Sequence, residues 1–456
     1  MPIKIPTIIS KARDLVEPKE EEAKKADQIA SALLIKVKKL AAYHPLRPKV
    51  ALGGSFAKGT WLKDALDIDI FVLFPRAIDA DKLEHEGLLL ARQSLSGQRP
   101  RLRYAQHPYL EGSIQGVRIN LVPCFETRIG EWKSAADRSP FHTDYMNEHL
   151  TNRLRTEVRL LKLFMKGVGC YGSEIKVQGF SGYACEILIL KYGTFVSALD
   201  NVSNWSDREV LCIEPSAKAE ANRHKGPLVI TDPIDKHRNL GAAISQQKIG
   251  RFVMAASSFL RSPRISYFRK TRRGANAFEL ELVRRSAVGV ILSHSTRSPD
   301  VLWGQLKKSD SHLRARLSSE GYEVARNTIA SDEQTKSALL YLIVNRELPS
   351  LLAKEGPEYF RVAESRKYIE KNSGSGKITW VGESGRLRSL RLRPDVSNLE
   401  SFIEELIKSK TSGISQGLRV AFTNSRILDG EKLLLESKAG NWLSEGLQNL
   451  VSSEKL

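Results

Sequence analysis

Two aspartates that follow a turn rich in glycine and serine are the residues of this sequence with the clearest capacity for chemistry. Gly53, Gly54 and Ser55 come directly after the apolar run 50–52, a pattern that predicts a strand turning sharply into a short helix. The free backbone N–H groups at such a helix start can receive a phosphate group. Twelve residues after Ser55, a second apolar run begins with Asp67 and Asp69.

The spacing of the two aspartates indicates a metal site. Successive side chains of a strand point to opposite faces, so Asp67 and Asp69 share one face while Ile68 points to the other. Neighbouring carboxylates repel each other, and a divalent cation relieves that repulsion. The turn and the acid pair together predict a place for a nucleoside triphosphate and its Mg²⁺, although each feature alone is more often an ordinary loop or a solvated strand end.

The residues around this unit resemble a known family. A Gly-Ser turn followed by an Asp-x-Asp strand is similar to the signature of the DNA polymerase beta type nucleotidyltransferase superfamily. The run 54–62, GSFAKGTWL, resembles more narrowly the archaeal-type (class I) CCA-adding enzymes. The resemblance implies that Asp67 and Asp69 are catalytic and bind metal, and that Ser55 and Lys58 bind the triphosphate. The family often has arginine in place of Lys58, a change that keeps the charge but loses the forked donor geometry.

The run 116–124 contains the main departure from the family pattern. The resemblance implies a third catalytic carboxylate at the position where this sequence has Asn120. An asparagine oxygen can still ligate a hard cation, but it is a poor base and carries no charge. Three outcomes stay open: weak activity, support from another carboxylate such as Glu126 or Asp137, or a tRNA-binding protein that has lost catalysis.

Four further candidates for nucleotide contacts lie in runs that match the family. They are His142, Lys162, Tyr171 and Arg238. The resemblance implies that His142 and Lys162 contact phosphate groups, that Tyr171 stacks on the sugar or base, and that Arg238 reads the incoming base. Judged by residue type alone, these would be surface or core side chains, and Arg238 could instead bond Asp235 or a tRNA phosphate.

The matching run 176–186 leads into the apolar residues 187–190 and predicts a buried helix. Within it, Ser181 and Glu186 are expected to cap the helix start or to serve in packing, because serine and glutamate near a helix start are commonly structural.

Composition and charge limit the classes of partner. The chain has 456 residues, of which 41% are hydrophobic, enough for two to four packed domains. Its formal charge of +19 predicts a polyanionic partner, and nucleic acid is favoured over a membrane because no long apolar segment is present. The start of the chain lacks the apolar core of a signal peptide, and its cysteines have no C-x-x-C spacing, so we expect a cytoplasmic protein with reduced cysteines. The four cysteines are Cys124, Cys170, Cys185 and Cys212.

Apolar periodicity predicts the elements that must position these residues. Helices are expected at 17–43, 81–94, 153–167, 246–260 and 302–319. After the signature unit, strands are expected at 101–106, 109–114 and 117–125, and later at 278–283, 287–292, 322–325 and 338–345. The small and polar run 217–225 is expected to be a surface loop.

Arginine and leucine alternate in the run 386–393. A strand there would place Arg386 and Arg388 on one face and Arg391 and Arg393 on the other. Such a basic strand could bind tRNA phosphates or could be an exposed edge protected by charge.

These patterns and the resemblance predict an α+β multidomain protein. It would consist of a polymerase-beta-like nucleotidyltransferase head with a mixed sheet of about five strands, a helical middle domain for nucleotide recognition, and a C-terminal α/β RNA-binding region, at 1–145, 146–262 and 263–456. The resemblance implies template-free, Mg²⁺-dependent addition of CCA to the acceptor arm and 3′ end of tRNA from CTP and ATP. It implies no membrane partner and leaves room for a homodimer. A rival is a nucleotidyltransferase for another acceptor, such as a small nucleotide or an antibiotic, which would not need the basic C-terminal half.

Overall fold

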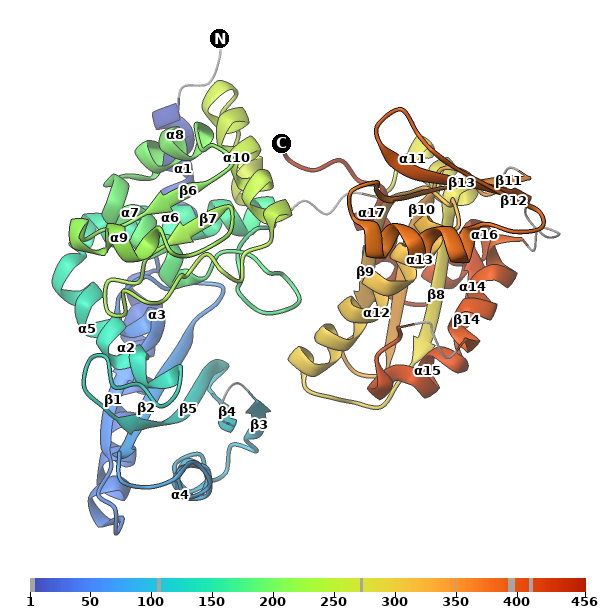
Figure 1. The fold of residues 1–456 in the computed structure, drawn as a ribbon. Helices are drawn as coiled ribbons and strands as arrows, with labels where there is room; N and C mark the ends of the chain where they lie inside the picture. Colours follow the sequence, from blue (N-terminus) through green and yellow to red (C-terminus); the bar gives the residue numbers. More distant parts are fainter. Residues whose placement is uncertain (1–4, 105–107, 271–273, 349, 393–397, 410–412) are drawn as a thin grey trace. The chain divides into compact units, whose positions relative to one another are not determined.

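The computed structural model describes residues 5–104, 108–270, 274–348, 350–392, 398–409 and 413–456 (Figure 1). The chain forms two compact units. Unit 1 comprises Met1–Arg272 with Glu454–Leu456, and unit 2 comprises Arg273–Ser453. Unit 1 has two separate apolar cores, and its division into a head and a middle domain stays a prediction. No helix in the described ranges is long and apolar enough to cross a membrane.

A mixed five-stranded sheet forms the head, as expected. Its strands are β1 (Lys49–Gly53), β2 (Asp67–Pro75), β3 (Arg101–Tyr104), β4 (Pro108–Ile114) and β5 (Val117–Glu126). They follow the order β1-β2-β5-β4-β3, in which β2 and β5 are parallel and the other pairs are antiparallel. One face packs on helices α2 (Glu20–Tyr43) and α4 (Ala80–Ser94), where Ile68, Ile70 and Val72 are buried. The other face of β2 therefore carries Asp67 and Asp69.

Local signals explain where the two covering helices begin. At the start of α2, the side chain of Glu22 accepts a hydrogen bond from the backbone N–H of Lys19 at 2.8 Å, and three glutamates in the first turn interact favourably with the positive end of the helix dipole. At the start of α4, the side chain of Asp79 accepts a hydrogen bond from the backbone N–H of Lys82. Both helices thus agree with the expected segments to within three residues.

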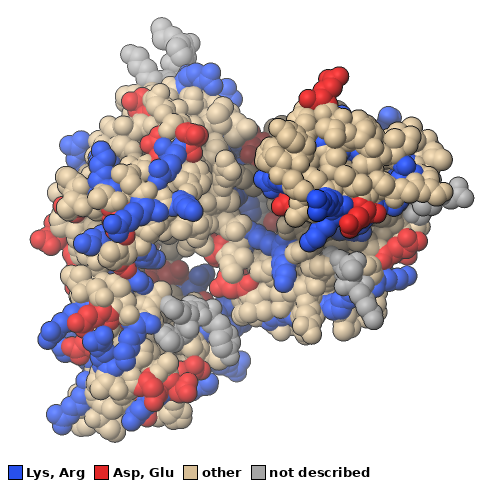
Figure 2. Space-filling model, viewed as in Figure 1, with Lys and Arg blue, Asp and Glu red and all other residues tan. Residues whose placement is uncertain are grey.

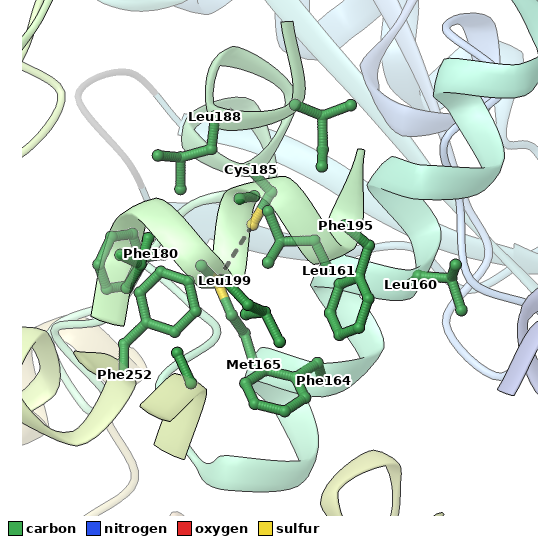
Figure 3. Packing of buried hydrophobic residues seen from close by; sticks show 14 of the residues in the cluster. Leu160, Leu161, Phe164, Met165, Phe180, Cys185, Leu188, Phe195, Leu199 and Phe252 are labelled. Atoms are coloured by element: carbon green, nitrogen blue, oxygen red, sulfur yellow. Dashed lines mark hydrogen bonds between the residues drawn. The ribbon is translucent and has the colours of Figure 1, made fainter. Parts of the chain in front are cut away.

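The second core of unit 1 is mainly helical. It is formed by α1 (Ile5–Val16), α5 (Ser139–His149), α6 (Asn152–Val168), α7 (Gly182–Tyr192), α8 (Phe195–Ser203), α10 (Gln246–Arg261) and the 3-10 helix η3 (Ile265–Phe268). A short parallel pair, β6 (Glu209–Leu211) with β7 (Leu228–Ile230), lies beside these helices. Phe164 of α6 contacts Phe195 edge to face, with ring centroids 5.5 Å apart, and Cys185 lies against Met165 in the same core (Figure 3).

A four-stranded antiparallel sheet with helices on both faces organises unit 2. Its order is β14-β8-β10-β9, with β8 (Ala287–Ser293), β9 (Val324–Ser331), β10 (Lys336–Ile343) and β14 (Arg426–Asp429). One face packs on α12 (Pro299–Ser319), α14 (Leu399–Lys408) and α15 (Arg419–Thr423), the other on α11 (Ala277–Ser286), α16 (Gly430–Ser437) and α17 (Asn441–Val451). Strand β8 is apolar and buried on both sides, since Val290 faces one core and Ile291 the other.

A second sheet of unit 2 has three strands, in the order β11-β13-β12. They are β11 (Leu351–Glu358), β12 (Lys377–Val381) and β13 (Arg386–Leu392), and helix α13 (Val362–Asn372) lies on one face, where Tyr368 bonds Ser389 at 2.8 Å. The arginine-rich run is therefore a strand, as expected, but it is central, so the exposed-edge interpretation is wrong. Arg393 lies outside the described residues.

Three expected segments differ from the structure. The strand expected at 322–325 begins later and extends further, as β9 (Val324–Ser331). Residues 278–283, expected as a strand, belong to helix α11, because Asn276 and Glu279 form a capping box and the buried side chains, Glu279 and Val283, follow a helical spacing. The alternating apolar residues that suggested a strand include Phe278, which is exposed. The expected loop 217–225 contains a short helix, α9 (Lys218–Ala221).

Candidate active site

The two aspartates lie on the face of the head sheet opposite α2 and α4, next to the turn that contains Ser55. Gly53 pairs with Asp69 across β1 and β2, and the turn continues directly into α3 (Gly54–Ala57). Gly54 has a positive φ of 69°, and a Cβ atom at this position would collide with the carboxylate of Asp69. Glycine is needed there for both reasons, and its absent side chain brings the turn against the acid pair.

Donors from strand β5 meet both carboxylates. In the parallel register, Arg118 lies opposite Asp67 and Asn120 lies opposite Asp69. The Nε atom of Arg118 is 3.4 Å from a carboxylate oxygen of Asp67, and Nδ2 of Asn120 donates to Oδ1 of Asp69 at 2.8 Å. Strand register therefore supplies each acid with one partner.

The chemistry of this donor set fits a hard cation. Burial raises the pKa of Asp67 and that of Asp69 above the ordinary value of a carboxyl group. Two partly desolvated carboxylates on one strand face are oxygen ligands of the kind that Mg²⁺ takes, and a cation would favour their ionised form. In the described part of the chain, no three carboxylate, thiol or imidazole side chains are near enough to share one metal ion.

Asn120 is only half satisfied by the protein. Its amide nitrogen is bonded to Asp69, whereas its carbonyl oxygen is buried without a partner. Neither carboxylate considered as a substitute can reach it. Glu126 lies at the far end of β5, paired with Lys49 at 2.5 Å, and Asp137 is buried among backbone N–H groups and the hydroxyl of Ser134.

Two of the predicted phosphate-binding residues meet at a buried glutamate. Nζ of Lys58 donates to Oε2 of Glu186 at 2.5 Å, and Nζ of Lys162 donates to Oε1 at 3.0 Å. The hydroxyl of Thr60 also donates to Glu186, at 2.6 Å. Burial opposes ionisation of Glu186, but Lys162 and Lys58 outweigh it and lower its pKa to about 2. With both lysines protonated, the cluster carries one net positive charge, while burial lowers the pKa of Lys58 below that of an exposed lysine.

Sequence reasoning assigned Glu186 to capping or packing, which is wrong. Ser181 is indeed the N-cap of α7 and accepts from the backbone N–H of Ala184 at 3.0 Å. Glu186 is fully buried and binds lysines from two distant segments. A glutamate inside an apolar helix was a signal for this role, because buried carboxylates are almost always paired.

A third group of residues surrounds Asp232, whose side chain is fully buried. His142 and Arg238 bond one carboxylate oxygen at 2.9 and 3.1 Å, and Tyr183 bonds the other at 3.2 Å. Burial alone would raise the pKa of Asp232, but these partners hold it below its ordinary value. The guanidinium of Arg238 therefore bonds Asp232, whereas the carboxylate of Asp235 pairs with Arg138 at 2.8 Å.

Aromatic contacts connect this third group with the lysines. The rings of His142 and Tyr183 stack with centroids 4.0 Å apart, and Nζ of Lys58 lies 5.3 Å from the ring centre of Tyr183. Tyr171 and Lys162 both approach Gly182, the first residue of α7. Burial lowers the pKa of His142, so its imidazole favours the neutral form.

All the candidate residues predicted from the sequence lie in unit 1, in three neighbouring groups. Sequence reasoning missed Thr60, Tyr183 and Asp232, which support the candidates from runs that matched the family. Most of their partners lie far away in the sequence: Asp232 is 90 positions from His142, and Thr60 is 126 positions from Glu186. Arg238, six positions after Asp232, is a nearby partner that could have indicated this group.

Family models match three successive parts of the chain. A nucleotidyltransferase domain matches residues 35–142, the second domain of a tRNA nucleotidyltransferase matches residues 156–269, and the C-terminal domain of a CCA-adding enzyme matches residues 285–429. The order of the matches is that of the head, the helical core and unit 2.

Several archaeal proteins are similar along most of their length. A CCA-adding enzyme of Pyrobaculum islandicum is 34% identical over 371 residues, 80% of this chain and 86% of that protein. The CCA-adding enzyme of Sulfurisphaera tokodaii is 33% identical over 89% of this chain and 92% of its own length. That of Pyrobaculum neutrophilum is 37% identical over 77% of this chain and 82% of its own length. Because this chain has an acid pair beside a Gly-Ser turn and is more than 30% identical to these proteins along most of their length, it belongs to the CCA-adding enzymes, a family of nucleotidyltransferases.

Proposed function

We propose that this protein builds and repairs the 3′-terminal CCA of tRNA. It transfers CMP, CMP and AMP from CTP and ATP to the terminal 3′-hydroxyl, without a nucleic-acid template, and releases pyrophosphate. The observation that carries this proposal is the acid pair of β2 against the turn that bears Ser55. The inactive alternative is not favoured, because the relatives that match most of the chain are named as enzymes.

The first two groups of the site would hold the triphosphate and its metal. Asp67 and Asp69 would bind Mg²⁺, which supplies charge stabilisation at the reacting phosphate. Ser55 and Lys58 would contact the β and γ phosphates, with Lys162 and His142 beside them. The net positive charge left by Glu186 supports this assignment, because phosphate groups need cations that are held in place.

The third group would select the base. Arg238 presents fixed donors, and its bond to Asp232 restricts the orientation of the guanidinium plane. Its side chain is 38% exposed, so donors remain accessible to a nucleotide. Tyr171 would stack on the sugar or base. We infer that this arrangement chooses C or A by hydrogen bonding to the base edge.

The remaining surface would bind tRNA by shape and phosphate contacts. Lys and Arg side chains are spread over the face shown in Figure 2 and interleaved with acidic residues. In unit 2, Arg388 and Trp380 are neighbours across β13 and β12, and both are partly exposed, an arrangement that suits RNA. We also infer a cytoplasmic place of action, in keeping with a tRNA substrate, and a homodimer stays a prediction.

A tRNA that lacks its CCA end tests the proposal. With labelled CTP and ATP, we expect Mg²⁺-dependent lengthening by three nucleotides, in the order C, C, A. A tRNA that already ends in CCA is the matched control and should not be lengthened. Binding of the tRNA without any lengthening would contradict the proposal. Efficient transfer to a small nucleotide by the full-length protein, with no transfer to tRNA, would also contradict it.

A further inference from the structure

The register of the head sheet places a second carboxylate beside Asn120. In the antiparallel β4–β5 pair, Glu111 lies directly opposite Asn120, and in the parallel β2–β5 pair Asn120 lies opposite Asp69. Residues directly opposite each other on neighbouring strands share a face. Gly53 on β1 and Arg101 on β3 extend the same row, which therefore crosses all five strands.

The order of residues along this row gives it a direction. The row begins at Gly53, one residue before the turn that would hold the triphosphate, passes Asp69, and reaches Asn120 and then Glu111. In phosphoryl transfer the attacking hydroxyl and the leaving group lie roughly in line, on opposite sides of the phosphorus. If pyrophosphate leaves on the β1 side, the hydroxyl must approach from the side of β5 and β4.

A groove on that side can admit the end of an RNA strand. It has a volume of about 740 Å³ and is lined by both Asp67 and Glu111, together with basic side chains that include Arg99, Arg101 and Arg118. Arginines that line a groove can contact the phosphates of the strand, and Asp67 and Glu111 line the same groove. The charge of Glu111 is felt at Asp67, where it raises the pKa of that carboxyl group.

Asn120 cannot take the proton of the attacking hydroxyl, because its side chain is neutral and its nitrogen is already bonded to Asp69. Its buried carbonyl oxygen has no partner and can accept a hydrogen bond that orients the hydroxyl. Glu111 is the nearest carboxylate in the row beyond it. The side chain of Glu111 is 18% exposed and is held by Arg103, whose Nη2 donates to Oε1 at 2.7 Å.

We propose that Glu111 is the third catalytic carboxylate of this site and that it accepts the proton of the attacking 3′-hydroxyl. This inference rests on the proposed function. The proton passes to the carboxylate of Glu111 as the hydroxyl oxygen bonds the α-phosphorus of CTP or ATP. The bond from that phosphorus to the bridging oxygen breaks, pyrophosphate leaves with the electron pair, and Glu111 then returns the proton to solvent.

Single-turnover addition of CMP to a tRNA lacking CCA tests the proposal in the full-length protein. We expect Glu111→Gln to lower the transfer rate constant about 100-fold, within the range for loss of a general base, and to leave the apparent Kd for CTP within twofold. Glu126→Gln removes a carboxylate from the far end of β5 and is the matched control, expected to stay within twofold in both constants. A Glu111→Gln rate within threefold of the wild type would overturn the proposal.

A double variant separates catalysis from a structural role. Asn120→Asp places a carboxylate where the family pattern has one, so Glu111 should become dispensable in that background. The double variant Asn120→Asp/Glu111→Gln should therefore have a rate constant within tenfold of that of Asn120→Asp alone. An undiminished loss of about 100-fold in the double variant would overturn the proposal. Arg103→Gln breaks the same ion pair but keeps the Glu111 carboxylate, and should cost less than tenfold. Equal losses for Arg103→Gln and Glu111→Gln would make Glu111 a structural partner only.

The wild-type reaction distinguishes the two levels of inference. If the wild-type protein lengthens the tRNA and Glu111→Gln does so equally well, only the role of Glu111 fails. If the wild-type protein lengthens no tRNA, the proposed function itself fails. Thermal unfolding of each variant shows whether a lost rate reflects lost folding, and Glu111→Gln should unfold within about 2 °C of the wild type because it preserves shape.

Discussion

The two largest sheets of this protein differ in what covers them. The four-stranded sheet of unit 2 has helices on both faces, and its strand β8 is apolar throughout its buried length, with Val290 toward one core and Ile291 toward the other. The five-stranded head sheet packs α2 and α4 on one face, and its other face carries Asp67, Asp69 and Asn120. A sheet face that is only partly covered by helices can keep charged side chains at lower cost than a face buried in an apolar core, and we expect the chemistry there.

The helical core of unit 1 adds a third case. Glu186 is as deeply buried as Val290, yet it is ionised, because two lysines and a threonine satisfy its oxygens. Burial alone therefore does not exclude a carboxylate from a core. What excludes it is burial without partners.

The largest effect is expected when a carboxylate enters the covered sheet. Val290→Asp would place an unpaired acid in the core of unit 2, and we expect a loss of about 5 kcal/mol in its free energy of unfolding, measured by urea denaturation followed by circular dichroism. Ser113→Asp is the matched control, because Ser113 is exposed and lies on the same face of the head sheet as Asp67, and it should cost less than about 0.5 kcal/mol. Similar losses of stability in the two variants would contradict the proposed difference between the two sheets.

Removing one charge from the acid pair of β2 should lower the activity and leave the stability unchanged. Asp69→Asn keeps the side-chain shape, and we expect the rate constant of CMP addition to fall on the order of 1,000-fold, about 4 kcal/mol of transition-state stabilisation. The melting temperature should change by less than about 2 °C. A variant that retained a tenth of the wild-type rate would place the chemistry elsewhere.

The paired carboxylate should be costly to remove. Glu186→Gln leaves Lys58 and Lys162 buried without their anion, and we expect a loss of about 3 kcal/mol at pH 7. The folded-state pKa of Glu186 is about 2, below its ordinary value of 4.5, so the stabilisation is complete above pH 4.5 and is lost as the pH falls toward 2. The difference between wild type and variant should shrink across that interval. A difference independent of pH would show that charge is not its source.

The smallest effect is expected at Asn120. Asn120→Asp replaces the amide that donates to Asp69 with a second carboxylate, and the repulsion between the two acids should cost about 1 kcal/mol in the absence of Mg²⁺. Addition of Mg²⁺ should reverse that loss in a thermal unfolding experiment. If Glu111 already takes the proton, the rate of CMP addition should rise less than tenfold. A rise of 100-fold or more would identify the natural asparagine as a defect of the site.

Local patterns predicted much of the fold and part of the site. The alternation around Asp67 and Asp69 gave their shared face correctly, and helical periodicity gave α2, α4, α6 and α10. The strand expected at 278–283 failed because alternation in a short segment also suits one face of a helix, and the capping box at Asn276 decided for the helix. Short apolar runs do not distinguish these states by themselves.

Only the tertiary structure decided which side chains meet. The sequence determined the acid pair, the glycine turn and the buried helix that holds Glu186, because each depends on residues a few positions apart. It did not place Glu111 beside Asn120 or bring Lys58 to Glu186, 128 positions away. Strand register and helix packing depend on how the whole core is filled, and that information is distributed over residues far apart in the chain.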